Sequence, residues 1–352
     1  MRILHTYCLN YNIGDYALGI GVKNILRKYL DVDFIGETNI QGRDFTRYYI
    51  NEVVNKRYDL LVIGGGGIIH GSHWPNGWFW LIDKELIKQI KIPFLIYGAG
   101  NNYWDQEEQI PQHGIEHLKE TYRLANYFSV RNDGSFNRLK AQTGIEAQVI
   151  PDPGFHVNLS KNLYRPIKNE YIVVQLANDK VKYRFGSEEG RNTFIYQIRS
   201  VVSKLAEKYH VVLAPHVLDD LELSQKVING ILNTSIWDFQ YFAFDHVHET
   251  LGYYKHAEFV IAMRGHGQIV PLSFNTPVIS ISNHPKHRGL MEELGMLHFN
   301  VEVADIELEA NILMLVAEIE QDREKIQIKL ARINQELAEQ TREELKIIKD
   351  SI

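Results

Sequence analysis

The chain has one cysteine, Cys8, among its 352 residues, which excludes an intrachain disulfide framework and a multi-cysteine metal cage. No apolar run approaches the ~18 residues that a membrane helix needs, and the first residues lack the pattern of a secretion signal. Basic residues are not in excess either: 38 Lys and Arg against 44 Asp and Glu give a net charge of −6. This balance argues against a general nucleic-acid or anionic-membrane binder. We therefore expect a soluble, cytoplasmic protein with no transmembrane segment and no nucleic-acid partner.

Three common catalytic or cofactor-binding motifs are absent as well. The dinucleotide pattern G-x-G-x-x-G fails at Gly19 and Gly21, because Asn24 stands where the third glycine would be. The fifteen histidines include no H-E-x-x-H zinc motif, and the chain has no G-x-S-x-G nucleophile elbow. We therefore expect no resident cofactor and no metal ion.

What the chain does contain is typical of a globular protein: 45% of its residues are hydrophobic, 23% charged and 11% aromatic. Short apolar runs alternate with helical stretches such as 16–30 and 193–208. The runs are continuous rather than alternating, which is typical of parallel strands covered on both faces. The expected strands are 2–7, 60–63, 94–97, 127–130, 148–150, 171–176, 211–214, 259–262 and 278–282.

The strands form two series, which predicts two α/β domains that face each other across a cleft. We expect an N-terminal domain over residues 1–155, a polar linker over 156–170 and a second domain over 171–304. Residues 305–352 are charged and periodic in Ile and Leu, which predicts two helices or one kinked helix packing across the body. Dimerisation through this segment is the alternative, so a homo-oligomer is left open.

Glycine and polar residues gather after the expected strands, where ligands of parallel sheets bind. Glycines 64–67 either present backbone amides to an anion or make a tight strand-to-helix turn. Asp15 either caps the first helix or faces the cleft as a base or hydroxyl acceptor. Arg131 either binds a carboxylate or phosphate or forms a surface ion pair of small energetic value.

The densest cluster of such residues is Arg264-Gly265-His266-Gly267, which follows a buried strand and precedes a helix. An arginine can hold an oxyanion through two parallel hydrogen bonds, and a helix N-terminus adds amides. A histidine titrates near neutrality and can pass a proton. The next strand ends in a second basic segment, 282–288, which includes His284 and Lys286. Two cationic strand ends predict an anion pocket.

These residues belong to a series of blocks by which the sequence resembles the polysaccharide pyruvyltransferase family. The blocks occur in the family's order between about residues 10 and 295. They are Asn12-x-Gly14-Asp15, glycines 64–67, Ser129-Val130-Arg131, Asp152-Pro153-Gly154-Phe155, Pro215-His216 with Asp219 and Asp220, Met263-Arg264-x-His266, and Met291-Glu292-Glu293-Leu294-Gly295.

The resemblance implies a GT-B-like arrangement of two Rossmann-like domains. It also implies transfer of an enolpyruvyl unit from phosphoenolpyruvate, as co-substrate, to two hydroxyls of a sugar, with a cyclic pyruvate ketal and phosphate as products. The acceptor would be a sugar, an oligosaccharide or a lipid-linked glycan precursor. In this reading Arg264 holds the donor's phosphate or carboxylate, His266 transfers a proton, and Asp15 orients or deprotonates an acceptor hydroxyl.

The second domain would then bind the donor, and the first domain would bind the acceptor. The expected donor-binding residues are Arg264, Gly265, His266, Gly267, His284 and Lys286. The expected acceptor or cleft residues are Asn12, Gly14, Gly65, Gly66, Gly67, Arg131 and His216.

The sequence also departs from the family's pattern. Many relatives have alanine after the histidine, where this chain has Gly267, and an arginine at the end of the first strand of the second domain, where it reads Ile-Val-Val-Gln-Leu-Ala over 172–177. Arg184, Lys180 or Lys182 are candidates to replace that arginine. Two alternative functions stay open: a GT-B glycosyltransferase that uses a nucleotide-sugar, and a non-catalytic glycan- or anion-binding relative. The aromatic group Trp74, Trp78, Phe79 and Trp80 either stacks on a sugar ring or packs within the fold.

Overall fold

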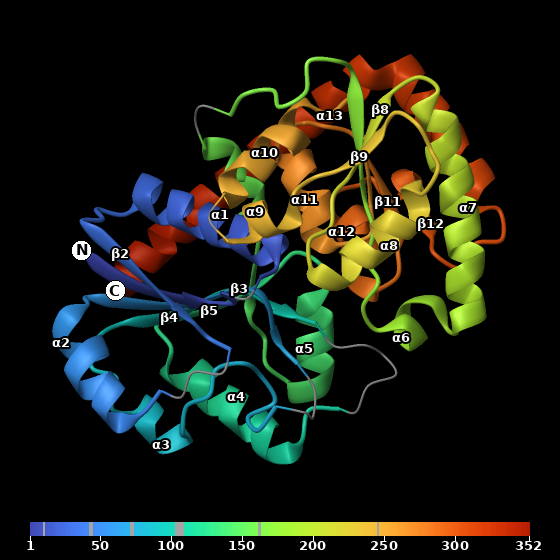
Figure 1. The fold of residues 1–352 in the computed structure, drawn as a ribbon. Coiled ribbons are helices and arrows are strands. Elements are labelled where there is room, and N and C mark those ends of the chain that lie inside the picture. The colour runs from blue at the N-terminus through green and yellow to red at the C-terminus, as the bar shows by residue number, and fades with distance from the viewer. Residues whose placement is uncertain (10, 42–44, 71–73, 103–108, 161–162, 245) are drawn as a thin grey trace. The chain divides into compact units, whose positions relative to one another are not determined.

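The computed structural model describes residues 1–9, 11–41, 45–70, 74–102, 109–160, 163–244 and 246–352. Within these residues the strands form two six-stranded sheets, and the strands of each pair run parallel. Helices lie on both faces of each sheet (Figure 1). The α/β class and the parallel pairing predicted from continuous apolar runs are therefore confirmed.

The first sheet has the order β2-β1-β3-β4-β5-β6. Its strands are β1 (Arg2–Tyr7), β2 (Phe34–Asn39), β3 (Leu60–Ile69), β4 (Phe94–Asn101), β5 (Tyr127–Arg131) and β6 (Gln148–Ile150). Its helical segments are α1 (Ile13–Tyr29), the π-helix η1 (Tyr49–Val54), α2 (Asn55–Arg57), α3 (Lys84–Ile87), α4 (Gln112–Leu124), α5 (Ser135–Thr143) and the 3₁₀ helix η2 (Pro153–Leu159).

The second sheet has the order β12-β11-β10-β7-β8-β9. Its strands are β7 (Tyr171–Gln175), β8 (His210–Leu213), β9 (Thr234–Ile236), β10 (Val260–Ala262), β11 (Val278–Ser282) and β12 (Asn300–Glu302). Its helical segments are α6 (Val181–Phe185), α7 (Glu188–Ala206), α8 (Leu218–Ile228), α9 (Phe239–Phe244), α10 (Val247–His256), α11 (Gly265–Ser273), α12 (Pro285–Glu293), the 3₁₀ helix η3 (Leu297–Phe299) and α13 (Leu308–Ser351).

The chain divides into two compact units. Unit 1 comprises Met1–Asn10, Leu18–His156 and Leu337–Ile352, and unit 2 comprises Tyr11–Ala17 and Val157–Glu336. The start of α1 therefore belongs to unit 2, whereas the expected boundaries assigned all of residues 1–155 to the first domain. Of the expected linker, residues 161–162 lie outside the described residues.

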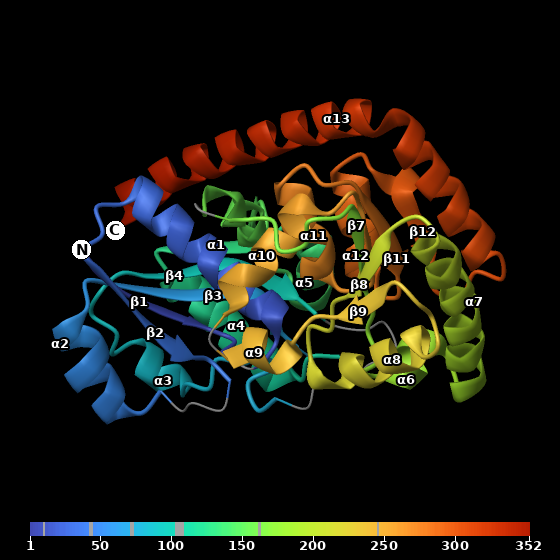
Figure 2. The same cartoon turned by 45° about the horizontal axis from the view of Figure 1, so that its top comes forward.

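The C-terminal helical extension is confirmed. It is the single element α13, and its backbone leaves the helical region at Asp322, where φ is −116° and ψ is 20°. Figure 2 shows the helix in red with the bend in its course. Its last residues, from Leu337 on, belong to unit 1, and the rest belongs to unit 2. Nowhere in the described ranges is a helix both long enough and apolar enough to span a membrane.

Alternate residues of β1 and β3 face opposite sides of the first sheet, as the two-residue period of a strand requires. Ile3 and Leu60 belong to one buried apolar cluster, together with Leu345 and Ile348 from the end of α13. Leu4 in β1 and Leu61 in β3 belong to the other cluster. Each face of the sheet therefore has its own core, and α13 completes one of them.

Two of the predicted strand ends were wrong. The glycines expected to follow the strand at 60–63 are inside β3, which continues to Ile69, and β4 likewise continues through Gly98 and Gly100 to Asn101. The prediction failed because glycine carries no strand signal, while the pairing of Gly66 with Ala99 in β4 extends both strands. Glycines 64–67 therefore do not form a strand-to-helix turn.

The aromatic group after β3 is part of the core. Trp78 and Trp80 have no exposed surface, Phe79 is buried, and Trp74 packs against the same cluster. Trp78 and Trp80 meet edge to face with ring centroids 5.6 Å apart. The packing interpretation is therefore correct for Trp78, Phe79 and Trp80, whose rings are not available to a sugar, and Trp74 packs on the same cluster while partly exposed.

Candidate functional site

The turn that carries Arg264 connects β10 to α11 at the carboxyl end of the second sheet. Ala262 is the last residue of β10, and the helix begins at Gly265. Arg264 is the residue before the helix and gives it no side-chain cap, so the first turn of α11 keeps amides directed out of its N-terminus. An uncapped helix N-terminus is a favourable place for an anion.

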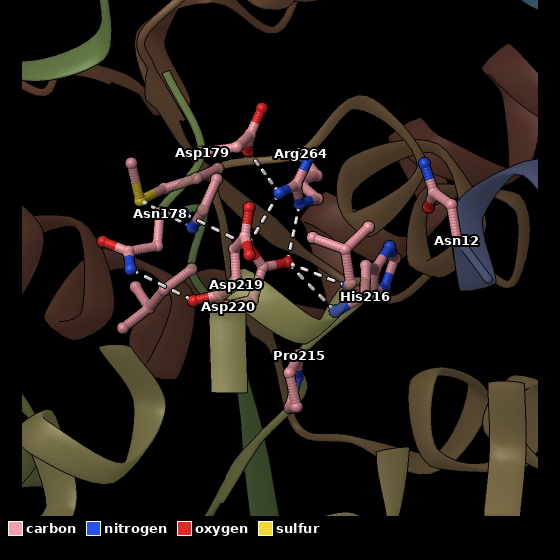
Figure 3. Close-up of polar contacts among 12 residues, drawn as sticks. Asn12, Asn178, Asp179, Pro215, His216, Asp219, Asp220 and Arg264 are labelled. Atoms are coloured by element: carbon pink, nitrogen blue, oxygen red, sulfur yellow. Dashed lines mark hydrogen bonds and ion pairs between the residues drawn. The ribbon is translucent and has the colours of Figure 1, made fainter. Parts of the chain in front are cut away.

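The Arg264 guanidinium is held by two carboxylates (Figure 3). Its Nε donates to Asp220 Oδ2 at 2.7 Å and its Nη2 to Asp220 Oδ1 at 2.6 Å, and Nη2 also donates to Asp179. Burial tends to lower the pKa of Arg264, but Asp220 and Asp179 outweigh that effect and raise it. The arginine expected to hold an anion thus already has two anionic partners within the chain.

Asp220 is a fully buried residue in the first turn of α8. Besides Arg264, its carboxylate accepts the backbone N–H groups of His216 and Val217 at 3.1 and 3.2 Å and that of Asn178 at 3.1 Å. It therefore joins the loops after β7 and β8 to the Arg264 turn. Five hydrogen bonds from three directions make Asp220 a fixed part of the site.

Asp179 lies in the loop after β7, with 30% of its side chain exposed. Its carboxylate accepts from Arg184 Nη2 at 3.0 and 3.1 Å as well as from Arg264. Burial tends to raise the pKa of the Asp179 carboxyl, but the positive charges of Arg264 and Arg184 outweigh it, so that the pKa lies below its usual range. The carboxylate is therefore ionised and bridges two guanidinium groups.

Arg184, one of the candidates to replace the missing arginine, is buried in this cluster. It lies in α6, and its Nε donates to the backbone carbonyl of Asp179 at 2.8 Å. Its Nη1 donates to the side-chain oxygen of Asn283, which follows β11. The loops after β7 and β11 thus meet at Arg184.

Gln175, the last residue of β7, accepts two hydrogen bonds from the backbone of the Arg264 turn. Its Oε1 accepts the backbone N–H of Arg264 at 2.7 Å, and its backbone carbonyl accepts that of Met263 at 3.0 Å. The same side chain lies against Gly267: a Cβ there would be 2.9 Å from Gln175 Oε1. Gln175 thus supplies hydrogen bonds but no charge at the end of β7.

The start of α1 packs against the same turn. A Cβ on Gly14 would lie 3.0 Å from His266 Nδ1, so a larger residue there would require the helix or the imidazole to shift. The Asn12 side chain accepts the Gly14 N–H at 3.0 Å and thereby caps the helix, and the Ile13 N–H donates to the backbone carbonyl of His216 at 3.0 Å. The helix begins at Ile13 rather than at residue 16, and the capping residue is Asn12 rather than Asp15, which is the third residue of α1.

His216 lies in the loop after β8 and is almost completely buried. Its Nε2 lies 2.6 Å from the Tyr254 hydroxyl, and its ring stacks on Trp237. Burial, and then the nearby Arg264 and His266, lower the pKa of His216 well below its ordinary value. The imidazole is therefore neutral at pH 7 and supports the loop after β8.

The second basic segment reaches the Arg264 turn. His284 caps α12, with its Nδ1 accepting the backbone N–H of Lys286 at 3.1 Å. The Lys286 side chain passes over Gly265, whose Cβ position would lie 3.9 Å from Lys286 Cε. The structure thus brings together, in unit 2, the expected donor residues Arg264, Gly265, His266, Gly267, His284 and Lys286 and the expected cleft residues Asn12, Gly14 and His216. Asp15, expected to be catalytic, follows Gly14 in the same unit.

The other expected acceptor residues lie in unit 1. Gly65 faces the side chain of Leu18 in α1, where a Cβ would overlap it, and Gly64 and Gly66 also have positive φ. Gly65 is required by the close approach of the strand to α1, and Gly64 by the backbone of Tyr97 in β4 and by its positive φ. Gly67 lies against Asn102. A role of Gly65, Gly66 and Gly67 in acceptor binding stays a prediction.

Arg131 in unit 1 forms ion pairs, but they are not at the surface. Its Nε donates to Asp133 at 2.6 Å and its Nη1 to Asp152 at 3.1 Å, and all three side chains are at most 5% exposed. Asp152 also accepts the Gly154 N–H at 2.8 Å. The Asp-Pro-Gly-Phe block is thus tied to β5 through Arg131. The small energetic value expected of a surface ion pair does not apply to these buried pairs.

Two site residues were missed from the sequence. At residues 172–177 we noted only that an arginine is missing and assigned no role to Gln175. Asp179 was not singled out at all. The rule that polar residues after parallel strands line the site would have identified Asp179, four residues after the end of β7. The described residues hold no group of three or more His, Cys, Asp and Glu side chains able to bind a metal ion.

Solved structures of low sequence identity share the fold. The S. aureus MnaA structure with UDP is 13% identical and covers 94% of this chain and 90% of that one, with a TM-score of 0.54. UDP-GlcNAc 2-epimerases of Neisseria meningitidis (13% identical, covering 96% and 99%) and Methanocaldococcus jannaschii (14% identical, covering 89% and 92%) also have TM-scores of 0.54. The fold is thus the predicted pair of Rossmann-like units of the GT-B type.

Sequence comparison is more specific than the fold. No curated protein matches the chain. The family model for polysaccharide pyruvyl transferase matches residues 12–285, which include Asn12, Asp15, Arg264 and His266. The match covers more than half of the sequence. It contains the elements of the site in unit 2 up to Pro285, where α12 begins. The chain therefore belongs to the polysaccharide pyruvyl transferase family.

Proposed function

We propose that this protein transfers a pyruvyl group from phosphoenolpyruvate to two hydroxyls of a sugar in a glycan or its lipid-linked precursor. The products are a cyclic pyruvate ketal and phosphate. The observation that carries the proposal is the joint packing of the Arg264–Gly267 turn with Gly14 and Lys286 in one unit, in a chain of the pyruvyl transferase family.

In the first step the donor's methylene carbon gains a proton, and one sugar hydroxyl forms a bond to C2. The C2–O bond to phosphate then breaks, and phosphate leaves with that electron pair. The second hydroxyl adds to C2 and closes the ketal. Of the two hydroxyl protons, one balances the proton that reaches the methyl group and the other leaves with phosphate.

The residues of the Arg264 turn match the charges that this reaction develops. Arg264, Lys286 and the amides at the start of α11 supply positive potential for the phosphate and carboxylate of the donor. His266 is the residue of this turn that can carry a proton to carbon or to the leaving group. Asp15, one residue after Gly14, is our candidate to orient or deprotonate an acceptor hydroxyl.

The test combines binding with turnover. Thermal unfolding is measured with phosphoenolpyruvate and with a panel of nucleotides and nucleotide-sugars, since a ligand at 100 times its Kd adds about 2.7 kcal/mol to the unfolding free energy. Phosphate release and a ketal methyl signal in proton NMR are then followed with a panel of glycan acceptors. We expect stabilisation by phosphoenolpyruvate and release of one phosphate per ketal formed.

His266→Ala should lower turnover about 10²- to 10⁴-fold and leave binding of phosphoenolpyruvate intact. Asp219→Asn, at an exposed position in the first turn of α8, is the matched control with unchanged turnover. Stabilisation by nucleotide-sugars alone would overturn the proposal in favour of a glycosyltransferase. Stabilisation by glycans or anions without turnover would favour a binding protein.

A further inference from the structure

The bridging carboxylate of Asp179 occupies the position of an anionic ligand. Its Oδ1 accepts from Nη2 of both Arg184 and Arg264, and its Oδ2 accepts a further bond from Arg184. Two guanidinium groups directed at one carboxylate form the kind of site by which proteins bind phosphate and carboxylate groups. Here the chain itself supplies the anion.

The two carboxylates of the cluster differ in how firmly they are held. Asp220 has no exposed side-chain surface and accepts three backbone N–H groups in addition to Arg264. The side chain of Asp179 is 30% exposed, and its carboxylate accepts from guanidinium groups of the described residues and from no backbone amide there. Asp220 is thus a structural partner of Arg264, whereas Asp179 lies where solvent, and a solute, can reach it.

We propose that Arg184 and Arg264 form a site for the carboxylate or phosphoryl group of the substrate, and that Asp179 occupies this site until the substrate anion replaces it. The inference rests on the proposed function only for the identity of that substrate. It assigns to Arg184 the cation that is missing at the end of β7. It also makes Asp179 an internal competitor of the substrate.

The backbone around Asp179 lets its side chain leave without a larger rearrangement. The backbone carbonyl of Asp179 accepts from Arg184 Nε at 2.8 Å, and the preceding residue, Asn178, is tied to Asp220 and to the carbonyl of Asp219 at 3.1 Å each. These contacts do not involve the Asp179 carboxylate. A rotation of this one side chain toward solvent is therefore enough to open the site.

The exchange also keeps the buried charges balanced. Asp220 and Asp179 together compensate Arg264 and Arg184, so the cluster has no net charge when both carboxylates are in place. An incoming carboxylate or phosphoryl group takes over the charge that Asp179 removes. Neither guanidinium is left buried without an anion, which would carry a large free-energy cost.

The experiment measures anion affinity by titration calorimetry for the wild type and for Asp179→Asn, with inorganic phosphate, pyruvate and phosphoenolpyruvate as separate probes. If the open form is about one tenth of the wild-type population, removal of the competing charge raises the affinity about tenfold. The phosphate and pyruvate arms show which group of the donor the two arginines bind. Unchanged or weaker binding of all three anions by a folded Asp179→Asn protein would overturn the inference.

Two further variants complete the test. Asp219→Asn removes a neighbouring exposed carboxylate and should leave each anion affinity unchanged, so an equal gain there would mean a general charge effect and contradict the site. Arg184→Lys keeps the charge but loses the planar fork and should weaken binding several-fold in the wild-type background. Equal affinity in Arg184→Lys would overturn the inference even if Asp179→Asn failed to fold.

The outcomes separate this inference from the proposed function. A gain in phosphate affinity in Asp179→Asn, with no turnover of phosphoenolpyruvate by any acceptor, supports the anion site and overturns the pyruvyl transfer. Turnover of phosphoenolpyruvate together with unchanged anion affinities in Asp179→Asn supports the pyruvyl transfer and overturns the anion site.

Discussion

The side chain of Gln175 fills the space that a side chain on Gly267 would occupy. A Cβ on Gly267 would lie 2.9 Å from Gln175 Oε1 and 3.1 Å from its Cγ. The same Oε1 accepts the Arg264 N–H at 2.7 Å, and Gln175 Nε2 donates to the Leu176 carbonyl at 2.6 Å. Gln175 and Gly267 are therefore in contact, and the residue at one position restricts the residue at the other.

We predict that Gly267→Ala destabilises the protein and weakens phosphate binding. The added methyl group must displace a fully buried amide that holds the Arg264 turn. Overpacking of this kind costs about 1–3 kcal/mol, and the better helix propensity of alanine offsets about 1 kcal/mol of it. Urea unfolding and phosphate titration measure the two effects.

Gly265→Ala is the matched control in the same helical turn. Its Cβ would meet Lys286 Cε at 3.9 Å, an ordinary contact, so we expect the unfolding free energy to change by less than about 0.5 kcal/mol or to rise slightly. Equal stability of Gly267→Ala and Gly265→Ala would show that Gln175 does not restrict residue 267.

We predict that Asp220→Asn destabilises unit 2 strongly. The variant keeps the shape of the side chain but removes the charge opposite a buried guanidinium. It also replaces one of the two oxygens that accept the three backbone N–H groups with an NH2 group, which can only donate. Breaking a buried ion pair costs about 3–5 kcal/mol. Asp219→Asn, one residue earlier and exposed, should stay within about 0.5 kcal/mol of the wild type. Urea midpoints of the two variants within error of each other would contradict this role of Asp220.

The unfolding free energy should fall as the pH decreases from 6.5 to 4. Burial, as the largest cause, lowers the pKa of both His5 and His156 to about 4. In this range the unfolded chain binds protons at these histidines and the folded chain does not, so each contributes a loss of about 1.4 kcal/mol per pH unit.

His156→Gln tests this pH dependence. The glutamine can still bond to Thr341, which lies 2.9 Å from His156 Nε2, but it does not titrate. Urea unfolding at a series of pH values should therefore show a shallower decline for the variant than for the wild type. A decline of equal slope would mean that His156 is protonated in the folded protein as readily as in the unfolded chain.

Two adjacent isoleucines in α13 should differ sharply in the unfolding free energy that is lost when each is replaced by alanine. Ile348 has no exposed surface and belongs to the cluster with Ile3 and Tyr97, whereas Ile347 is 54% exposed. Ile348→Ala should cost about 2–5 kcal/mol of unfolding free energy, and Ile347→Ala less than about 1 kcal/mol. A small effect at Ile348 would mean that the end of α13 does not contribute to the core of unit 1.

The interior strands were predictable from the sequence, and most of the edge strands were not. β10 and β11 read as continuous apolar runs because both faces of an interior parallel strand are covered. β2, β9 and β12 were not predicted, since they lie at sheet edges with partly exposed residues. An edge strand needs a neighbour's hydrogen bonds rather than a long apolar run, and a sequence does not show the neighbour.

The sequence also identified the Arg264-x-His266 turn, because a charged residue directly after a buried strand stands out against its surroundings. It did not show that Arg264 has carboxylate partners. Asp179 and Asp220 are 85 and 44 residues away along the chain, and they meet Arg264 because β7, β8 and β10 are neighbours in the sheet.

The sequence by itself determined the two α/β units, the family and the position of the Arg264-x-His266 turn, since each depends on residue type and local order. Tertiary structure alone decided which charges are compensated, that Gln175 lies against Gly267, and that the start of α1 belongs to unit 2. These are contacts between distant segments. Their energies come from burial and from hydrogen bonds that exist only when the strand ends are brought to one edge of the sheet.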